Sequence, residues 1–168
     1  MALARGLILG LISLSLILGC IGRERCCAHI KGGCDPGWRA FGEFCYTVTD
    51  RTFPAWSDAK QECIGMGAIM AAPQSDRESA FFQTLPALRP QFWIDCAYQT
   101  NLGEWECEGD EDDFEFRDWK PNEPNYLDRE HCATFSIVDG RWNNGPCHWE
   151  HHPAQAICKK PTGPNLYF

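Results

Sequence analysis

The order of apolar and polar positions along the chain predicts two early helices. Residues 55–66, AWSDAKQECIGM, place apolar side chains at helical spacing, and Gly65 and Gly67 mark the expected end of that helix. Further along, Ser75 and Glu78 form a capping box ahead of an apolar run. This motif predicts the start of a second helix.

The same pattern predicts several short strands. Residues 38–48, WRAFGEFCYTV, alternate around Gly42 and predict a hairpin that brings Cys34 and Cys45 close enough to be bridged. The other strand candidates are AIMAAP at 68–73, QFWIDCAY at 91–98, CATFSIV at 132–138, GRWNN at 140–144 and AQAICKK at 154–160.

Between these strands, residues 99–131 show little regular pattern and are rich in Gly, Pro, Asn and acidic residues. A loop of this length inside a compact domain is usually functional. Two early helices, scattered short strands and one long polar loop together predict an α+β fold.

The first residues have the character of a secretory leader. Residues 7–19 are apolar or small and follow Arg5, and the run is too short to span a membrane. We expect residues 1–22 to be a signal peptide cleaved after Gly22, with cleavage after Gly19 as an alternative. A bacterial lipoprotein leader is a less favoured alternative because many cysteines follow. The protein is therefore predicted to be secreted and extracellular, with no membrane span.

The charge of the chain excludes some classes of partner. Its formal net charge is −8, and residues 1–22 contain one Arg and no acid, so the charge without them is −9. Such an acidic chain is a poor ligand for nucleic acid or an anionic membrane. Cations, basic proteins and neutral ligands such as sugars are the expected partners.

Cysteines are abundant for a chain of this length. There are eleven, and ten remain if Cys20 leaves with the leader, which in an exported protein predicts a disulfide framework. Cys26 and Cys27 are adjacent in the polar stalk at residues 23–33, and neighbouring cysteines rarely bond each other. They are expected to reach a distant cysteine or another chain. Residues 161–168 are expected to be an unstructured tail.

We do not predict an enzyme. Neither His29 nor His131 belongs to a motif for a catalytic triad or an acid–base pair. The cluster His148, His151 and His152 has a spacing that permits transition-metal binding or a response to pH, although exposed loop histidines usually do neither.

Within the long loop, the segment EPNYLDREHC at 123–132 gathers oxygen ligands without a nucleophile. Glu123, Asn125 and Glu130 offer the side-chain oxygens that calcium prefers, and Asn143 and Asn144 can supply further ligands. The bond before Pro124 is of the one type that adopts the cis form at modest cost, and a cis bond would turn Glu123 and Asn125 toward the same point.

These features resemble a known family. From Cys34 to Lys159 the chain is similar to a C-type lectin domain of the long form, and we expect the domain to span residues 34–160. The resemblance rests on seven elements in order: CDPGW, FCY, AWSDAKQEC, WIDC, EPN, GRWNN and AICK. It implies two helices and small antiparallel sheets with a long ligand-binding loop, stapled by disulfides.

The resemblance also implies the disulfide pairing. The expected bonds are Cys63–Cys158, Cys132–Cys147, Cys34–Cys45 and an additional bridge between Cys96 and Cys107. These four bonds leave Cys26 and Cys27 for a disulfide-linked homo-oligomer.

For function, the resemblance implies a calcium-dependent carbohydrate-binding protein that recognises glycans on cells or microbes. The implied ligands of both Ca²⁺ and sugar are Glu123, Asn125, Glu130, Asn143 and Asn144. The order Glu-Pro-Asn is similar to the arrangement of lectins that bind mannose, fucose, N-acetylglucosamine or glucose.

One residue departs from the family pattern. Sugar-binding members have Trp-Asn-Asp where this chain has Trp142, Asn143 and Asn144, so one carboxylate is missing and calcium should bind more weakly. The alternative is a sugar-independent module that binds protein, ice or mineral. The acidic run EGDEDDFE at 108–115 fits that alternative, because it could contact a basic partner or a mineral surface. It could also form an extra cation site. The simplest interpretation is a solvated loop.

Overall fold

The computed structural model describes residues 33–110 and 115–163. The predicted signal peptide, Cys26 and Cys27 of the stalk, and the tail beyond Gly163 lie outside these residues. All the elements described below belong to one compact unit.

The described residues contain two helices and eight strands. In chain order they are β1 (Arg39–Phe41), β2 (Phe44–Val48), α1 (Trp56–Gly65), β3 (Ile69–Met70), α2 (Asp76–Phe82), β4 (Gln91–Gln99), β5 (Glu104–Cys107), β6 (Cys132–Ser136), β7 (Trp142–Gly145) and β8 (Gln155–Pro161). This confirms the predicted α+β fold.

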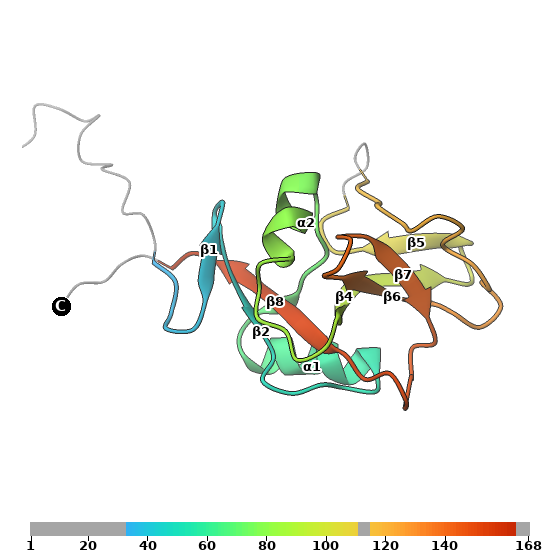
Figure 1. The fold of residues 1–168 in the computed structure, drawn as a ribbon, viewed down its shortest axis with the longest axis horizontal. Helices are drawn as coiled ribbons and strands as arrows, with labels where there is room; N and C mark the ends of the chain where they lie inside the picture. The colour runs from blue at the N-terminus through green and yellow to red at the C-terminus, as the bar shows by residue number, and fades with distance from the viewer. Residues whose placement is uncertain (1–32, 111–114, 164–168) are drawn as a thin grey trace, which may run out of the picture. The chain divides into compact units, whose positions relative to one another are not determined.

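The last strand joins the two halves of the sheet (Figure 1). The strand order is β1-β2-β8-β4-β6-β7, with β3 added to β8 and β5 added to β4. β8 pairs antiparallel with β2 and parallel with β4, whereas β4, β6 and β7 pair antiparallel in sequence. The N-terminal hairpin therefore lies at one end of the sheet, and the strands that flank the long loop lie at the other.

Side chains alternate along the central strands and build two cores. On β4, Phe92 and Ile94 point into one cluster and Trp93 into the other; on β8, Ile157 enters the first and Ala156 the second. Successive side chains of a strand point to opposite faces of the sheet. Because β4 and β8 have a core on each face, their side chains are apolar at successive positions and not only at every second one.

Each core is covered by one helix. On the first, Phe82 of α2 makes edge-to-face contacts with Tyr46 and Phe135, with ring centroids 5.6 Å apart in both pairs. On the second, Ala59 and Cys63 of α1 are buried in a cluster with Met70 and Trp93. Figure 1 shows the two helices on opposite sides of β8.

The capping box of α2 is confirmed in its first half and altered in its second. The Ser75 hydroxyl accepts a hydrogen bond from the Glu78 N–H at 3.2 Å. The Glu78 carboxylate accepts from the Gln74 N–H at 2.8 Å and from the Tyr46 hydroxyl, and not from Ser75. The glutamate thereby ties the start of α2 to β2 of the core.

Two sequence predictions need correction. Residues 99–131 are not all loop, because β4 continues to Gln99 and pairs with β5 through a turn that contains Gly103 at φ 78°. The Tyr98 and Trp105 rings, 5.6 Å apart, pack across this hairpin. The predicted strand at 68–73 is reduced to two residues, although Ala71 and Ala72 are fully buried.

All four implied disulfides are present: Cys34–Cys45, Cys63–Cys158, Cys96–Cys107 and Cys132–Cys147. The second ties α1 to β8 over 95 residues, and the last closes the β6–β7 hairpin over 15 residues.

The disulfides should differ in their contribution to stability according to the loop that each closes. Replacing both Cys63 and Cys158 by Ala opens a 95-residue loop and should lower the free energy of unfolding by about 4–5 kcal/mol. Removing Cys34 and Cys45, 11 residues apart, should cost only about 3 kcal/mol. Urea unfolding of the two double variants measures both values, and equal losses would contradict the loop-entropy explanation.

Candidate functional site

Strand β7 anchors the middle of the long loop. The Trp142 N–H donates to the Asp118 carbonyl at 2.8 Å, and the Lys120 N–H donates to the Trp142 carbonyl at 2.8 Å. Residues 118–120 therefore add a short backbone bridge to the free side of β7. This pairing fixes the chain just ahead of Glu123.

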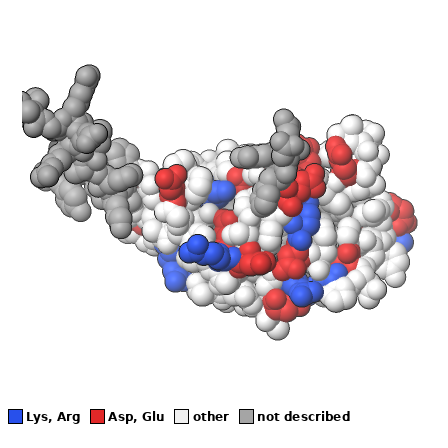
Figure 2. All heavy atoms as spheres, turned by 90° about the horizontal axis from the view of Figure 1, so that it is seen from above, with Lys and Arg blue, Asp and Glu red and all other residues white. Residues whose placement is uncertain are grey.

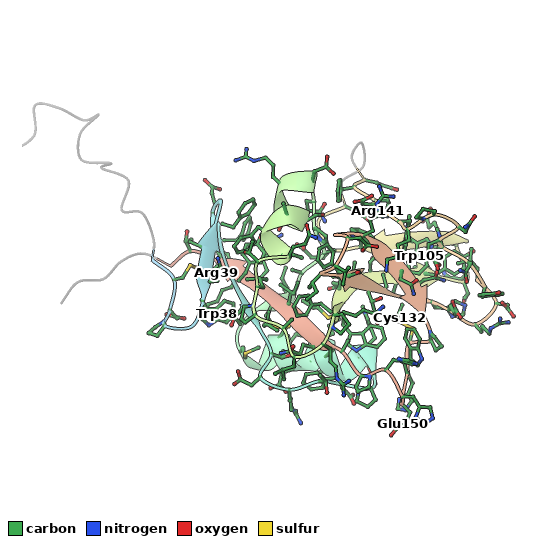
Figure 3. All side chains as sticks on the ribbon, in the orientation of Figure 1. Trp38, Arg39, Trp105, Cys132, Arg141 and Glu150 are labelled. Atoms are coloured by element: carbon green, nitrogen blue, oxygen red, sulfur yellow. A yellow bond between two sulfur atoms is a disulfide. The ribbon has the colours of Figure 1, made fainter. Side chains whose placement is uncertain are left out.

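Three tryptophans pack beneath the loop. The Trp119 ring lies 4.7 Å from that of Trp105 on β5 and 5.4 Å from that of Trp142 on β7. In Figure 3, Trp105 and Cys132 lie on the part of the domain formed by β4 to β7. The tryptophans bury apolar surface between the loop and the sheet, and thereby hold a polar segment that has no helix or sheet of its own.

Arg117 holds the earlier part of the loop. Its guanidinium donates to both carboxylate oxygens of Asp110 at 2.7 Å and to the Trp105 carbonyl at 3.1 Å. A planar guanidinium that bonds two carboxylate oxygens is a strong and directional contact. Arg117 was not predicted from the sequence, although a single arginine two residues after an acidic run was the available signal.

The predicted ligand segment turns at a cis Glu123–Pro124 bond. The Glu123 Oε2 and the Asn125 Oδ1 are both buried, and neither has a hydrogen-bond donor among the residues that the structure describes. A buried acceptor without a donor is costly, and such atoms in native proteins usually face a water or an ion. Two oxygens of this kind, one anionic, suit a hard cation.

Desolvation outweighs the favourable contacts of the Glu123 carboxyl with the described protein groups. Burial raises the pKa of the Glu123 carboxyl, and the nearby negative charge of Glu130 raises it further, whereas the backbone of Asn125 and the charge of Lys120 lower it. A bound cation would reverse the net shift, because it favours the ionised carboxylate.

Asn144 makes three hydrogen bonds to the loop. Its Oδ1 accepts from the Asn125 N–H at 3.0 Å, and its Nδ2 donates to the carbonyls of Asn125 at 2.6 Å and Glu130 at 2.8 Å. The preceding Asn143 donates through its Nδ2 to the Asn144 carbonyl at 2.6 Å, which leaves the Asn143 Oδ1 as the acceptor of that side chain.

The structure thus brings the five predicted site residues together. Asn144 contacts Asn125 and Glu130, Asn143 precedes it on β7, and Glu123 lies within electrostatic reach of Glu130. Only two of the five carry a formal charge. Accordingly, no group of three or more His, Cys, Asp and Glu residues suited to a metal occurs among residues 33–110 and 115–163.

The rim of the site carries an exposed aromatic ring. Tyr126 is 58% exposed and adopts φ 45°, a conformation that is uncommon for a residue other than glycine. The Arg129 guanidinium lies over its ring, 4.3 Å from the centroid. The sequence analysis did not identify Arg129.

The acidic run at 108–115 is partly outside the described residues, since 111–114 are not described. Glu108, the first residue of the run, pairs with Lys159 at 3.2 Å, and Asp110 pairs with Arg117. Figure 2 shows acidic and basic side chains next to one another on the face that it draws. These described acids bind protein cations, which favours a structural role for them.

The histidine cluster is dispersed over an exposed loop. His148 lies 3.2 Å from Glu150, which lies at the tip of the loop that connects β7 to β8 (Figure 3). The His152 ring packs 4.7 Å from that of Trp149. Nothing in this arrangement assembles a metal site among the described residues.

The profile of the Lectin C-type domain family matches residues 54–160. The chain belongs to the C-type lectin domain family. This is a family of binding domains and not of enzymes. None of the helices in the described part of the chain has the length and apolar character needed to cross a membrane.

Two relatives illustrate the range of the family. The chain is 31% identical over 139 residues to C-type mannose receptor 2 of Rattus norvegicus, with 79% of this chain but only 9% of the receptor covered. It is 31% identical over 128 residues to ladderlectin of Oncorhynchus mykiss, with 71% of this chain and 65% of that protein covered.

Solved structures show the same fold. The carbohydrate-recognition domain of the mouse scavenger receptor C-type lectin superposes with a TM-score of 0.66 at 24% identity, covering 77% of this chain and 98% of that one. A calcium-independent type II antifreeze protein superposes with a TM-score of 0.66 at 24% identity, covering 79% and 97%.

The paired hydrogen bonds of the Arg117 guanidinium to Asp110, here called the fork, can be tested by mutation. Arg117→Lys keeps the charge but loses the paired bonds to Asp110, so the free energy of unfolding should fall by about 1–2 kcal/mol. Arg141→Lys, at an exposed position beside β7, is the matched control and should leave stability unchanged. Equal unfolding curves for both variants would show that the fork contributes nothing.

Proposed function

We propose that this domain is a secreted, calcium-dependent lectin that binds neutral sugars of the mannose class through the long loop. The observation that carries the proposal is the pair of buried acceptor oxygens, Glu123 Oε2 and Asn125 Oδ1, that have no donor. Family membership supplies the context, since a mannose receptor is among the relatives of this chain.

We assign the metal ligands to four of the five predicted residues: Glu123, Asn125, Glu130 and Asn143. Asn144 is assigned a hydrogen-bonding role, because both ends of its amide already bond the loop. When bound, the calcium ion would offer coordination positions to neighbouring sugar hydroxyls. With two carboxylates in the set, the affinity should be in the weak range typical of extracellular sites.

The side chains of the site offer both acceptors and a donor for hydrogen bonds with the sugar hydroxyls. The carboxylates of Glu123 and Glu130 accept hydrogen bonds from hydroxyl groups, and the Asn125 Nδ2 donates to a hydroxyl oxygen. The order Glu-Pro-Asn favours mannose, fucose, N-acetylglucosamine and glucose. Tyr126 at the rim offers its exposed ring for stacking against the apolar face of a sugar.

Single sites of this kind bind weakly, so useful avidity requires several domains in one assembly. Disulfides through Cys26 or Cys27 would provide such an assembly after the leader at residues 1–22 is removed. In this setting the protein would recognise glycans on cells or microbes in the extracellular space.

A sugar-independent module that binds protein, ice or mineral is the second candidate. It is favoured by the replacement of a carboxylate by Asn144, whose side chain is occupied by hydrogen bonds. The likeness to a calcium-independent antifreeze protein shows a shared fold only and does not decide between the two.

Calcium titration tests the metal site. Isothermal titration of the purified protein should give one site with a dissociation constant of roughly 10⁻⁴–10⁻³ M, as is usual for extracellular calcium modules. Glu123→Gln removes one of the two carboxylates and should weaken binding at least about tenfold. Glu104→Gln, an exposed position on β5, keeps the same change of charge away from the loop and should bind as the wild type does. No heat of binding in the wild type would refute the metal site.

A glycan array tests the sugar specificity. The protein, oligomerised on a fluorescent carrier, should bind mannose-class glycans in 5 mM calcium, a level about fivefold above the weakest expected dissociation constant. It should lose them in chelator, and galactose-terminated glycans serve as the control. Glycan binding that persists in chelator, or its complete absence, would favour the second candidate.

A further inference from the structure

The Asn144 side chain lies where the two ends of a turn meet. Residues Tyr126 to Glu130 form a compact turn in which the N–H groups of Arg129 and Glu130 donate to the Tyr126 carbonyl at 2.9 and 3.0 Å. Asn144 is 2% exposed, and its amide bonds Asn125, just before the turn, and Glu130, its last residue. One side chain of β7 therefore closes the 125–130 segment.

The hydrogen bonds define the orientation of this amide. Its oxygen faces the Asn125 N–H, and its nitrogen faces two carbonyl oxygens. The reversed amide would place nitrogen against the N–H and oxygen against both carbonyls, so it would lose all three bonds. Both protons of the Nδ2 are used, one for each carbonyl.

A carboxylate at this position would have the opposite effect. An ionised aspartate offers only acceptors, so one oxygen would still accept from the Asn125 N–H while the other faced the carbonyls of Asn125 and Glu130. Three acceptor oxygens in one buried place repel each other unless a proton or a cation lies between them. The protons of an asparagine supply that positive partner within the chain itself.

We propose that Asn144 is a positioning residue that holds the 125–130 segment on β7 without metal. The loop that carries Glu123, Asn125 and Tyr126 is then formed before any ion binds. This inference does not depend on the proposed function, since all three bonds join protein atoms.

If the proposed function holds, the calcium ion binds to a loop that Asn144 has already ordered. An ion that meets an ordered loop does not have to offset the entropy of ordering it, so less of its binding free energy is lost. With Asn144 the proposed site has one carboxylate fewer than with aspartate, but its loop is ordered before the ion binds. The same three hydrogen bonds of Asn144 would also keep the loop ordered for a ligand that binds without calcium.

Hydrogen exchange of the full-length protein tests the inference, with amide rates measured in chelator and in 5 mM calcium, a level set above the dissociation constants of weak extracellular sites. In the wild type, the amides of Asn125, Arg129 and Glu130 should exchange slowly in both conditions. In Asn144→Asp they should exchange about 10- to 100-fold faster in chelator, because two donated bonds are lost. Excess calcium should slow them again in this variant, since a third carboxylate joins the pocket.

Two controls separate local from global effects. The amides of Thr49 and Asp95, bonded to the carbonyls of Ala156 and Ala71 in the core, report whether the domain stays folded. Asn122→Asp makes the same chemical change at an exposed position of the same loop and should leave all rates as in the wild type.

The outcomes distinguish this inference from the calcium proposal. Wild-type loop amides that exchange fast in chelator and slow in calcium would overturn the role of Asn144, and this comparison needs no variant. Protection of the same amides in Asn144→Asp in chelator would overturn it as well. Wild-type protection in chelator together with no calcium binding by titration would support the role of Asn144 while refuting the calcium site.

Discussion

Strand β7 and its contacts hold the whole loop side of the domain. On one edge it pairs with β6, and on the other the Trp142 backbone exchanges hydrogen bonds with Asp118 and Lys120. From the same strand, the Asn144 amide reaches both ends of the 125–130 segment. A polar loop that lacks its own core can keep one conformation only when its backbone groups find such partners. The position of every candidate ligand depends on this short strand.

The position of β7 depends in turn on the two-sided core. Trp93 and Ile94 on β4 point to opposite clusters, so β4 is held between the helices, and β6 and β7 are built outward from it. The Cys132–Cys147 bond closes the hairpin just beside the site. The loop is therefore held by rigid strands. The polar side chains of the candidate site lie on a scaffold that is stabilised by the apolar cores and the disulfide.

The electrostatics of the site follow from how its oxygens are paired. Carbonyl oxygens of Asn125 and Glu130 receive the protons of Asn144, whereas Glu123 Oε2 and Asn125 Oδ1 receive none. The asparagine thus satisfies the carbonyl oxygens that shape the loop and leaves the side-chain oxygens of Glu123 and Asn125 available as the proposed metal ligands. On the proposed role of Asn144, the order of the loop would not depend on the proposed calcium ion, whereas an aspartate at this position would couple the two.

The sequence by itself determined the family, both helices and the disulfide pairing implied by the resemblance, because each is encoded in local spacing or in a motif. It also nominated the candidate ligands, which stay a prediction. It did not reveal the β4–β5 hairpin, whose strand pairing depends on Tyr98 and Trp105 meeting across a turn. It also treated Asn144 only as a missing charge. Which atoms its amide bonds is decided by residues 14 and 19 positions away along the chain, and only the tertiary structure brings those groups within hydrogen-bond distance.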